Sequence, residues 1–130
     1  MSAQFFELLE LLGGQAHAID SGRALDWART FTEDGVFASP SYPEPVRGRA
    51  ALTRFAERFA ANNPGAHHIV TNACIADSIG PDECRAMANL LIVRTLQDGA
   101  VRIERVTTIH DHLLREHGAL RVAERVVTRD

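Results

Sequence analysis

The sequence predicts an α+β fold in which about three N-terminal helices pack on one face of a curved antiparallel sheet. Apolar residues follow helical spacing in the first half of the chain, and from Ala66 onward they alternate with polar residues. Helices followed by a run of long strands are typical of this class. The length of 130 residues fits one domain, residues 1–130, with a single core and at most one buried pocket.

Three segments have helical spacing. The first begins after Ser2 and runs to about Ile19, where Asp20-Ser21-Gly22 interrupts it. A short second helix follows, with its apolar side formed by Leu25, Trp27, Ala28 and Phe31. The third spans 49–62, with its apolar side formed by Leu52, Phe55, Ala56 and Phe59. Asn63-Pro64-Gly65 ends it.

The remaining segments predict one loop and four strands. Pro40, Pro43 and Pro45 lie close together between Ala38 and Val46, and such a segment holds neither a helix nor a central strand. The strands are predicted at 67–79, 83–96, 101–115 and 120–128, because a turn signal containing glycine separates each from the next. They form an antiparallel meander.

Composition excludes several functions. The net charge of −3 argues against a nucleic-acid partner, and the absence of lysine excludes Schiff-base catalysis. We expect a cytoplasmic protein without a membrane partner, because the sequence shows no signal peptide and no apolar run of spanning length. Cys74 and Cys84 match no metal-site spacing and are predicted to be buried free thiols.

Four segments in register resemble a known superfamily: residues 20–37, which end in Thr-Glu-Asp-Gly-Val-Phe, and residues 47–52, 67–72 and 111–125. The chain resembles the nuclear transport factor 2-like superfamily, in particular its SnoaL-like and scytalone-dehydratase-like branches. The resemblance covers nearly the whole chain and implies a single SnoaL-like domain with a cone-shaped fold. It also implies a loop at the pocket mouth, a small-molecule substrate and a homodimer.

Asp20 and His68 stand where the resembled dehydratases carry a catalytic Asp–His pair. An imidazole exchanges protons near neutral pH, and an adjacent carboxylate orients the ring and stabilises its charged form. The alternative is structural: Asp20 caps the helix that enters at Ser21, and His68 is a hydrogen-bonded core residue. We predict that the two residues form a general acid–base pair.

Substrate contacts are predicted from His17, Asn72, Arg105 and Asp111. His17 lies one helical turn before Asp20, and Asn72 alternates in phase with His68 on its strand. Arg105 and Asp111 share one strand face, so Arg105 either pairs with Asp111 or binds a substrate oxygen. The alternative for Arg105 is a surface ion pair with Glu104 or Glu124.

The sequence departs from the family at two pocket positions. Many relatives carry tyrosines where this chain has Gln15 and Ile109, so no obvious phenolic proton donor remains. The missing phenols argue against scytalone-type dehydration, and His17 is the alternative proton donor.

A metal site is a weaker interpretation. His110, His112 and Glu116 have cupin-like spacing, but no further histidine follows His117 to complete such a site. We therefore expect neither metal nor cofactor.

The predicted function is a cofactor-independent acid–base enzyme of natural-product metabolism. It would act as a cyclase, dehydratase, isomerase or epoxide-opening enzyme on an apolar, polyketide-like molecule. The alternative is a noncatalytic ligand-binding or assembly module of the same fold. A homodimer is expected through the sheet face opposite the helices, to which Leu90, Ile92, Val106 and Thr108 are assigned.

Overall fold

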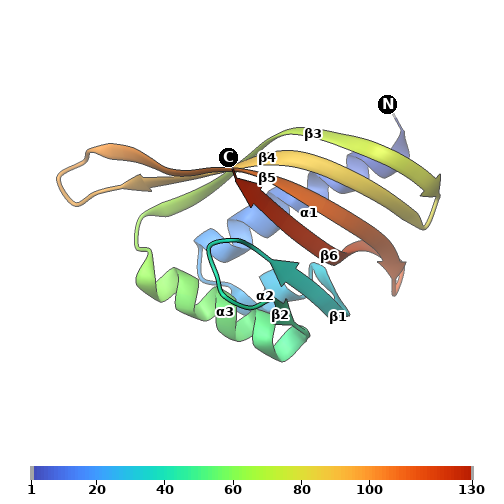
Figure 1. The fold of residues 1–130 in the computed structure, drawn as a ribbon, viewed down its shortest axis with the longest axis horizontal. Helices are drawn as coiled ribbons and strands as arrows, with labels where there is room; N and C mark the ends of the chain where they lie inside the picture. The colour runs from blue at the N-terminus through green and yellow to red at the C-terminus, as the bar shows by residue number, and fades with distance from the viewer. Residues whose placement is uncertain (1, 130) are drawn as a thin grey trace.

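The computed structural model describes residues 2–129, and within this range it confirms the predicted α+β fold. Three helices and six strands follow one another in this order: α1 (Ala3–Asp20), α2 (Ala24–Ala28), β1 (Phe31–Ala38), β2 (Val46–Arg47), α3 (Arg49–Asn62), β3 (Ala66–Gly80), β4 (Glu83–Thr95), β5 (Val101–Glu116) and β6 (Ala119–Arg129). The four long strands lie where the alternation predicted them, and Figure 1 shows them side by side with α1 behind them.

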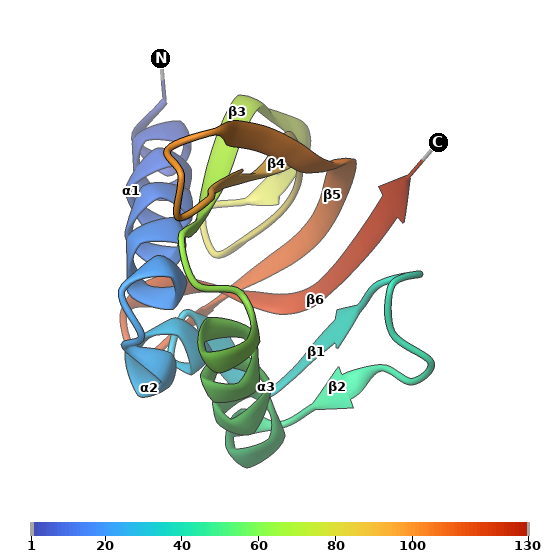
Figure 2. The same ribbon diagram turned by 90° about the vertical axis from the view of Figure 1, so that its left-hand side faces the viewer.

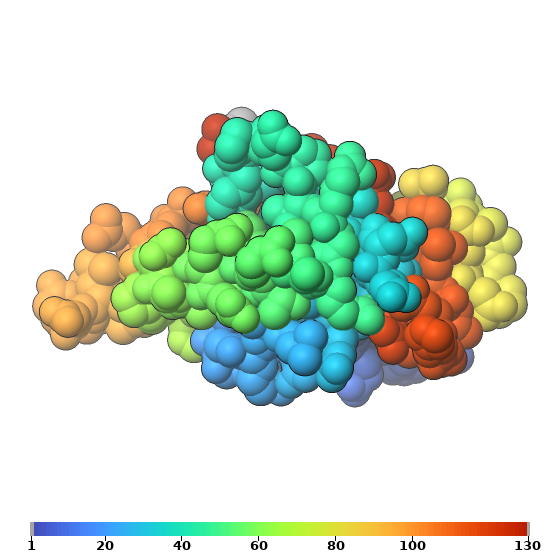
Figure 3. Space-filling view, turned by 90° about the horizontal axis from the view of Figure 1, so that it is seen from below, coloured from blue at the N-terminus to red at the C-terminus, as the bar shows by residue number. Residues whose placement is uncertain are grey.

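The strands form one sheet in the order β2-β1-β6-β5-β4-β3. Neighbouring strands are antiparallel, as predicted for the four long strands, except β1 and β6, which pair in parallel. The sheet curls strongly, and its concave side encloses the core (Figure 2). It stays open, because β2 and β3 are its edges in the part of the chain that the structure describes. The tip of the β4–β5 hairpin projects beyond the body (Figures 1 and 3).

The helices cover the concave side. The Ser2 side chain accepts a hydrogen bond from the Phe5 amide at the start of α1, as expected of an N-cap. Helix α1 then buries Leu8, Leu12 and Ile19 against the sheet. Helix α3 buries Leu52, Phe55, Ala56 and Phe59, and together with the segment after β1 it covers the side seen in Figure 3.

The second helix is shorter than predicted. It ends at Ala28, and Phe31 begins β1 instead of continuing the helical face. The Thr30 hydroxyl donates to the Trp27 carbonyl at 2.6 Å, so the chain turns immediately after the helix. Phe31 remains fully buried in the core, but from a strand.

A β-bulge in β3 reverses the predicted alternation. Asn72 has a φ of 55°, and the register with β4 shifts between Thr71 and Cys74. One residue is thereby added to the strand, so later side chains move to the opposite face. Cys74 is consequently exposed, contrary to the prediction, whereas Cys84 is buried; both thiols are free.

The two faces of the central strands also differ from the prediction at β4. Leu90 pairs with Thr107 on the concave side, so Leu90 and Ile92 are buried inside the cone and do not belong to an outer face. The outer face of the sheet, here called the convex face, instead exposes Ile69, Met87, Val106 and Val126.

Arg115 connects three parts of the chain at one end of the sheet. Its guanidinium donates two hydrogen bonds of 2.9 Å to the Glu7 carboxylate in α1. It also donates to Asp82, in the β3–β4 turn, at 2.7 Å. The hydrogen bond from Arg115 lowers the pKa of Glu7. No helix among residues 2–129 is long and apolar enough to cross a membrane.

Candidate functional site

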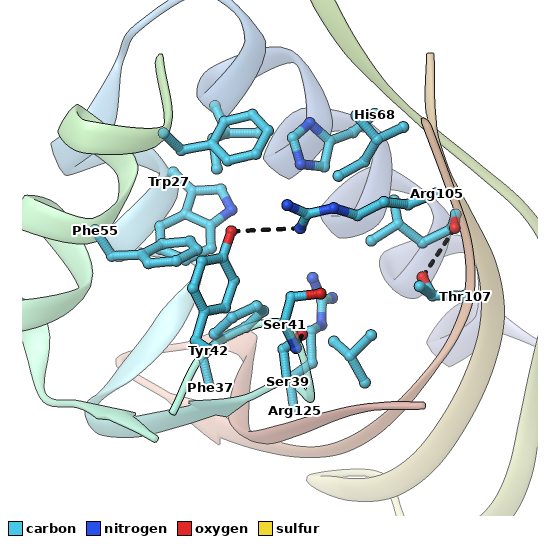
Figure 4. Close-up of a pocket in the computed structure, with 15 residues that line it drawn as sticks. Trp27, Phe37, Ser39, Ser41, Tyr42, Phe55, His68, Arg105, Thr107 and Arg125 are labelled. Atoms are coloured by element: carbon cyan, nitrogen blue, oxygen red, sulfur yellow. Dashed lines mark hydrogen bonds between the residues drawn. The ribbon is translucent and has the colours of Figure 1, made fainter. Parts of the chain in front are cut away.

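A narrow hollow lies between the concave face of the sheet, the helices and the proline-rich segment 39–45 (Figure 4). Its volume of about 50 Å³ is enough for a few water molecules. Most of its wall is apolar and comes from both halves of the chain: Ile19, Trp27, Phe37, Phe55, Phe59, Leu90, Ile92 and Val127. The polar groups at its wall come from Ser39, Ser41, Tyr42, His68, Arg105, Thr107 and Arg125.

Asp20 and His68 are in direct contact. Asp20 is the last residue of α1, and its carboxylate accepts the His68 backbone N–H at 3.1 and 3.0 Å. The same carboxylate lies 2.6 Å from Nδ1 of the His68 ring. A carboxylate at this distance favours a proton on Nδ1, which leaves Nε2 as the ring nitrogen that can exchange a proton with a ligand.

The predicted alternative for Asp20, a cap on the second helix, is not what the structure shows. Helix α2 has Arg23 at its N-cap, without any side-chain capping hydrogen bond. The Asp20 and His68 side chains are 13% and 12% exposed, and the His68 ring packs against Phe59 at a centroid distance of 4.9 Å. The ring is therefore held by the carboxylate on one side and by an aromatic ring in the wall.

Arg105 reaches into the hollow from β5 and meets Tyr42, which enters from segment 39–45 (Figure 4). Its Nη1 donates to the Tyr42 hydroxyl at 3.4 Å, and the guanidinium lies 5.7 Å from the Tyr42 ring centroid. Tyr42 packs edge-on against Phe55 at 5.0 Å. Arg105 is thus a pocket residue, while Glu104 lies 2.6 Å from Arg94 instead.

Asp111 pairs with Arg125 and not with Arg105. The Arg125 guanidinium donates two hydrogen bonds of 2.8 Å to the Asp111 carboxylate, and both residues are buried. Arg125 lines the hollow, whereas Asp111, its cross-strand partner on β5, does not. Asp111 therefore does not reach the hollow itself, and only the arginine that it pairs with does.

His17 and Asn72 lie outside the hollow, in a separate groove between α1 and β3. A helical offset of three residues turns His17 by about 60° from Asp20, and this places its side chain in solvent. The bulge redirects Asn72, whose amide donates to Asn89 at 2.8 Å. His68 lines both this groove and the hollow, but neither His17 nor Asn72 reaches the hollow, and Asp20 does not line the groove.

Gln15 and Ile109, the two positions at which the resemblance led us to expect tyrosines, are both buried. Gln15 donates to the Thr30 hydroxyl at 2.7 Å. A phenol nevertheless reaches the hollow from Tyr42, which sequence reasoning missed. The available signal was that the only tyrosine of the chain lies in the loop predicted to border the pocket mouth.

The sequence had indicated no binding role for Trp27, Phe37 or Arg125. All three line the hollow. His110 and His112 belong to the convex side of β5, where His112 lies 2.6 Å from Glu83 and His110 lies 3.2 Å from Thr128. Within residues 2–129, no three His, Cys, Asp or Glu side chains gather as a metal site would require.

Comparison with known proteins bears on this site. A family model described as a SnoaL-like domain matches residues 6–126. No curated protein is similar enough to count as a match.

Solved structures match over almost the whole chain. A protein from Catenulispora acidiphila in complex with S-DNPA is 30% identical, with a TM-score of 0.86, and the match covers 100% of this chain and 96% of that one. ActVI-ORFA from Streptomyces coelicolor is 28% identical, also with a TM-score of 0.86, over 99% of this chain and 98% of that one. An NTF2-like protein with a cystatin-like fold from Novosphingobium aromaticivorans is 22% identical, with a TM-score of 0.82, over 95% of this chain and 79% of that one. At this identity the similarity shows the fold alone.

Proposed function

The chain belongs to the SnoaL-like domain family, and we propose that it is an acid–base enzyme acting on an apolar, polyketide-like small molecule. The observation that carries the proposal is the contact of 2.6 Å between Asp20 and His68, whose ring lines a hollow with a mostly apolar wall. The reaction would be a cyclisation, dehydration, isomerisation or epoxide opening, because each needs only proton transfer at a positioned substrate. Neither metal nor cofactor enters this mechanism.

In the proposed mechanism, His68 accepts a substrate proton at Nε2 while Asp20 stabilises the imidazolium that forms. Negative charge then develops on a substrate oxygen. Arg105 and the Tyr42 hydroxyl lie on the same hollow, and donors fixed toward a developing oxyanion are a large source of rate enhancement. Tyr42 would also supply the phenolic proton donor that Gln15 and Ile109 do not provide.

The similar Catenulispora acidiphila protein, crystallised with S-DNPA, supports a small-molecule ligand for this chain. The hollow is too narrow for several fused rings as it stands. A ligand of that size requires that Tyr42 and Arg105, which meet across the hollow, move apart. Segment 39–45 carries Tyr42 and belongs to no helix or strand, so it is the part of the wall that can move.

The acid–base pair is tested by two substitutions, Asp20→Asn and His68→Ala, once metabolite screening has provided a substrate. Each should lower turnover by about 10²–10⁴ while the circular dichroism spectrum stays that of the wild type. His110→Ala is the matched control, because this histidine lies on the convex side and should leave turnover unchanged. Full activity in both pocket variants would refute the mechanism, and loss of activity through unfolding would assign the pair a structural role.

A noncatalytic binding module is the second candidate, favoured by the narrowness of the hollow. The two functions differ in what happens to a bound small molecule. An enzyme converts it, and a module returns it unchanged. Mass spectrometry of the substrate candidate after incubation with wild-type protein separates the two.

We also propose a homodimer that buries the convex face. Ile69, Met87, Val106 and Val126 are between 37% and 59% exposed there, and apolar surface of this kind is commonly covered by a symmetric partner. Light scattering at micromolar concentration should give twice the chain mass of 14.3 kDa. A stable monomer would contradict the proposal.

A further inference from the structure

The hollow presents positive and neutral groups to a ligand, and none of its lining residues in the described chain is acidic. Its basic groups are His68, Arg105 and Arg125. Two carboxylates lie near it without lining it, and each is paired with a basic residue that does: Asp20 with His68 and Asp111 with Arg125. The inner surface is therefore suited to an anion.

The three basic groups differ in how their charge is balanced. His68 has Asp20 at 2.6 Å, and Arg125 has Asp111 at 2.8 Å on two of its nitrogens. Arg105 has no ion pair within residues 2–129, and its recorded hydrogen bond is the 3.4 Å contact with the neutral Tyr42 hydroxyl. A guanidinium removed partly from water and left without a counter-charge gains most from an anionic partner.

We propose that the ligand of this pocket is an aromatic or polycyclic carboxylate whose carboxylate group binds Arg105. This inference rests on the proposed function and narrows its substrate class. The planar guanidinium offers paired N–H donors that match the two oxygens of a carboxylate. The Tyr42 hydroxyl provides another donor on the same side, and the rings of Trp27, Phe37 and Phe55 provide apolar walls for the ring system.

The contact between Arg105 and Tyr42 occupies the place that the anion would take. At 3.4 Å it is a long hydrogen bond, so little is lost when a carboxylate replaces it. When a carboxylate replaces this weak contact with two charge-assisted hydrogen bonds, Arg105 and Tyr42 would separate, which opens the hollow, and the same bonds would hold the ligand. His68 lines the same hollow, so an anchored ligand would present its rings to the proton-transfer group.

The proposal is tested with two probes of nearly the same shape, naphthoate and its neutral amide, naphthamide, titrated into the full-length protein at neutral pH. Wild type should bind naphthoate about 10- to 100-fold more tightly than naphthamide. Arg105→Gln should abolish this preference by weakening naphthoate alone. Arg102→Gln, an exposed arginine on the same strand, is the matched control and should keep the preference.

Several results would overturn the inference: equal affinity of wild type for the two probes, a preference that survives in Arg105→Gln, or no binding of either probe at millimolar concentration. A thermal melt of Arg105→Gln establishes that it is folded, and Arg105→Lys, which keeps the charge without the planar fork, should retain part of the preference. Asp20→Asn should keep the preference in full. A failed anion site and a failed acid–base pair therefore give different results.

Discussion

Loss of the charge on Asp111 should destabilise the protein more than loss of any exposed acidic group. The Asp111 and Arg125 side chains are 2% and 6% exposed and are joined by two hydrogen bonds of 2.8 Å. Asp111→Asn keeps the shape and one acceptor but leaves the guanidinium without its counter-charge. Breaking a buried pair in this way costs about 3–5 kcal/mol, and we expect the lower end because one hydrogen bond can remain.

Urea denaturation followed by circular dichroism measures this change. A loss of about 3 kcal/mol corresponds to a fall in melting temperature of roughly 10 °C for a domain of this size. Asp26→Asn is the control, because its pair with Arg23 is more than half exposed and should contribute less than about 1 kcal/mol. Replacement of both partners, as Asp111→Leu with Arg125→Met, should be less harmful than Asp111→Asn, since no charge is then left buried. If Asp111→Asn cost no more than Asp26→Asn, the reasoning would be refuted.

Two further predictions concern titration and thiol chemistry. The hydrogen bond from Arg115 lowers the pKa of Glu7. The ionised Glu7 side chain therefore stabilises the fold at pH values above the ordinary pKa of glutamate, and this contribution is lost as the pH falls through the lowered pKa. Urea denaturation at several pH values should show that the free energy of unfolding of the wild type exceeds that of Glu7→Gln by less than about 1 kcal/mol near neutral pH, because the pair is partly exposed. In acid the two free energies should become equal. A difference that does not change with pH would contradict this prediction. Burial raises the pKa of Cys84, so a thiol reagent should modify Cys74 in the native protein and Cys84 only after unfolding. Rapid modification of both thiols in the native wild type would contradict this prediction, and so would any modification of native Cys74→Ser.

Most of the fold could be predicted because it depends on local patterns. The end of α1 at Asp20 follows from the break at Ser21-Gly22, and the bounds of α3 follow from its apolar spacing and the Asn-Pro-Gly stop. The parallel pairing of β1 with β6 could not be predicted from alternation. It depends on a contact between distant parts of the chain, and a period of two is the same in parallel and antiparallel strands.

The candidate site could be predicted only in part. Asp20 and His68 were found through family positions, and the structure brings them into contact. Asn72 was misplaced because alternation assumes an unbroken strand, and one bulged residue invalidates it for everything beyond. Tyr42 was missed because a loop has no periodicity to indicate where its side chains point. Arg125 was missed because alternation along β6 assigns residues to a face of the sheet but does not show which of them line a pocket.

The place of β6 in the sheet has a consequence for how the molecule is made. This last strand lies between β1 and β5 and carries Arg125 and Val127 of the hollow's wall. Its pairing with β1 joins residues 31–38 to residues 119–129, and contacts between residues so far apart in the sequence slow the folding reaction. On the ribosome, the helices and strands β3 to β5 emerge before β6, so the wall of the hollow stays incomplete until β6 has left the exit tunnel. The wall of the hollow therefore cannot form from the earlier elements alone and needs β6 in place between β1 and β5.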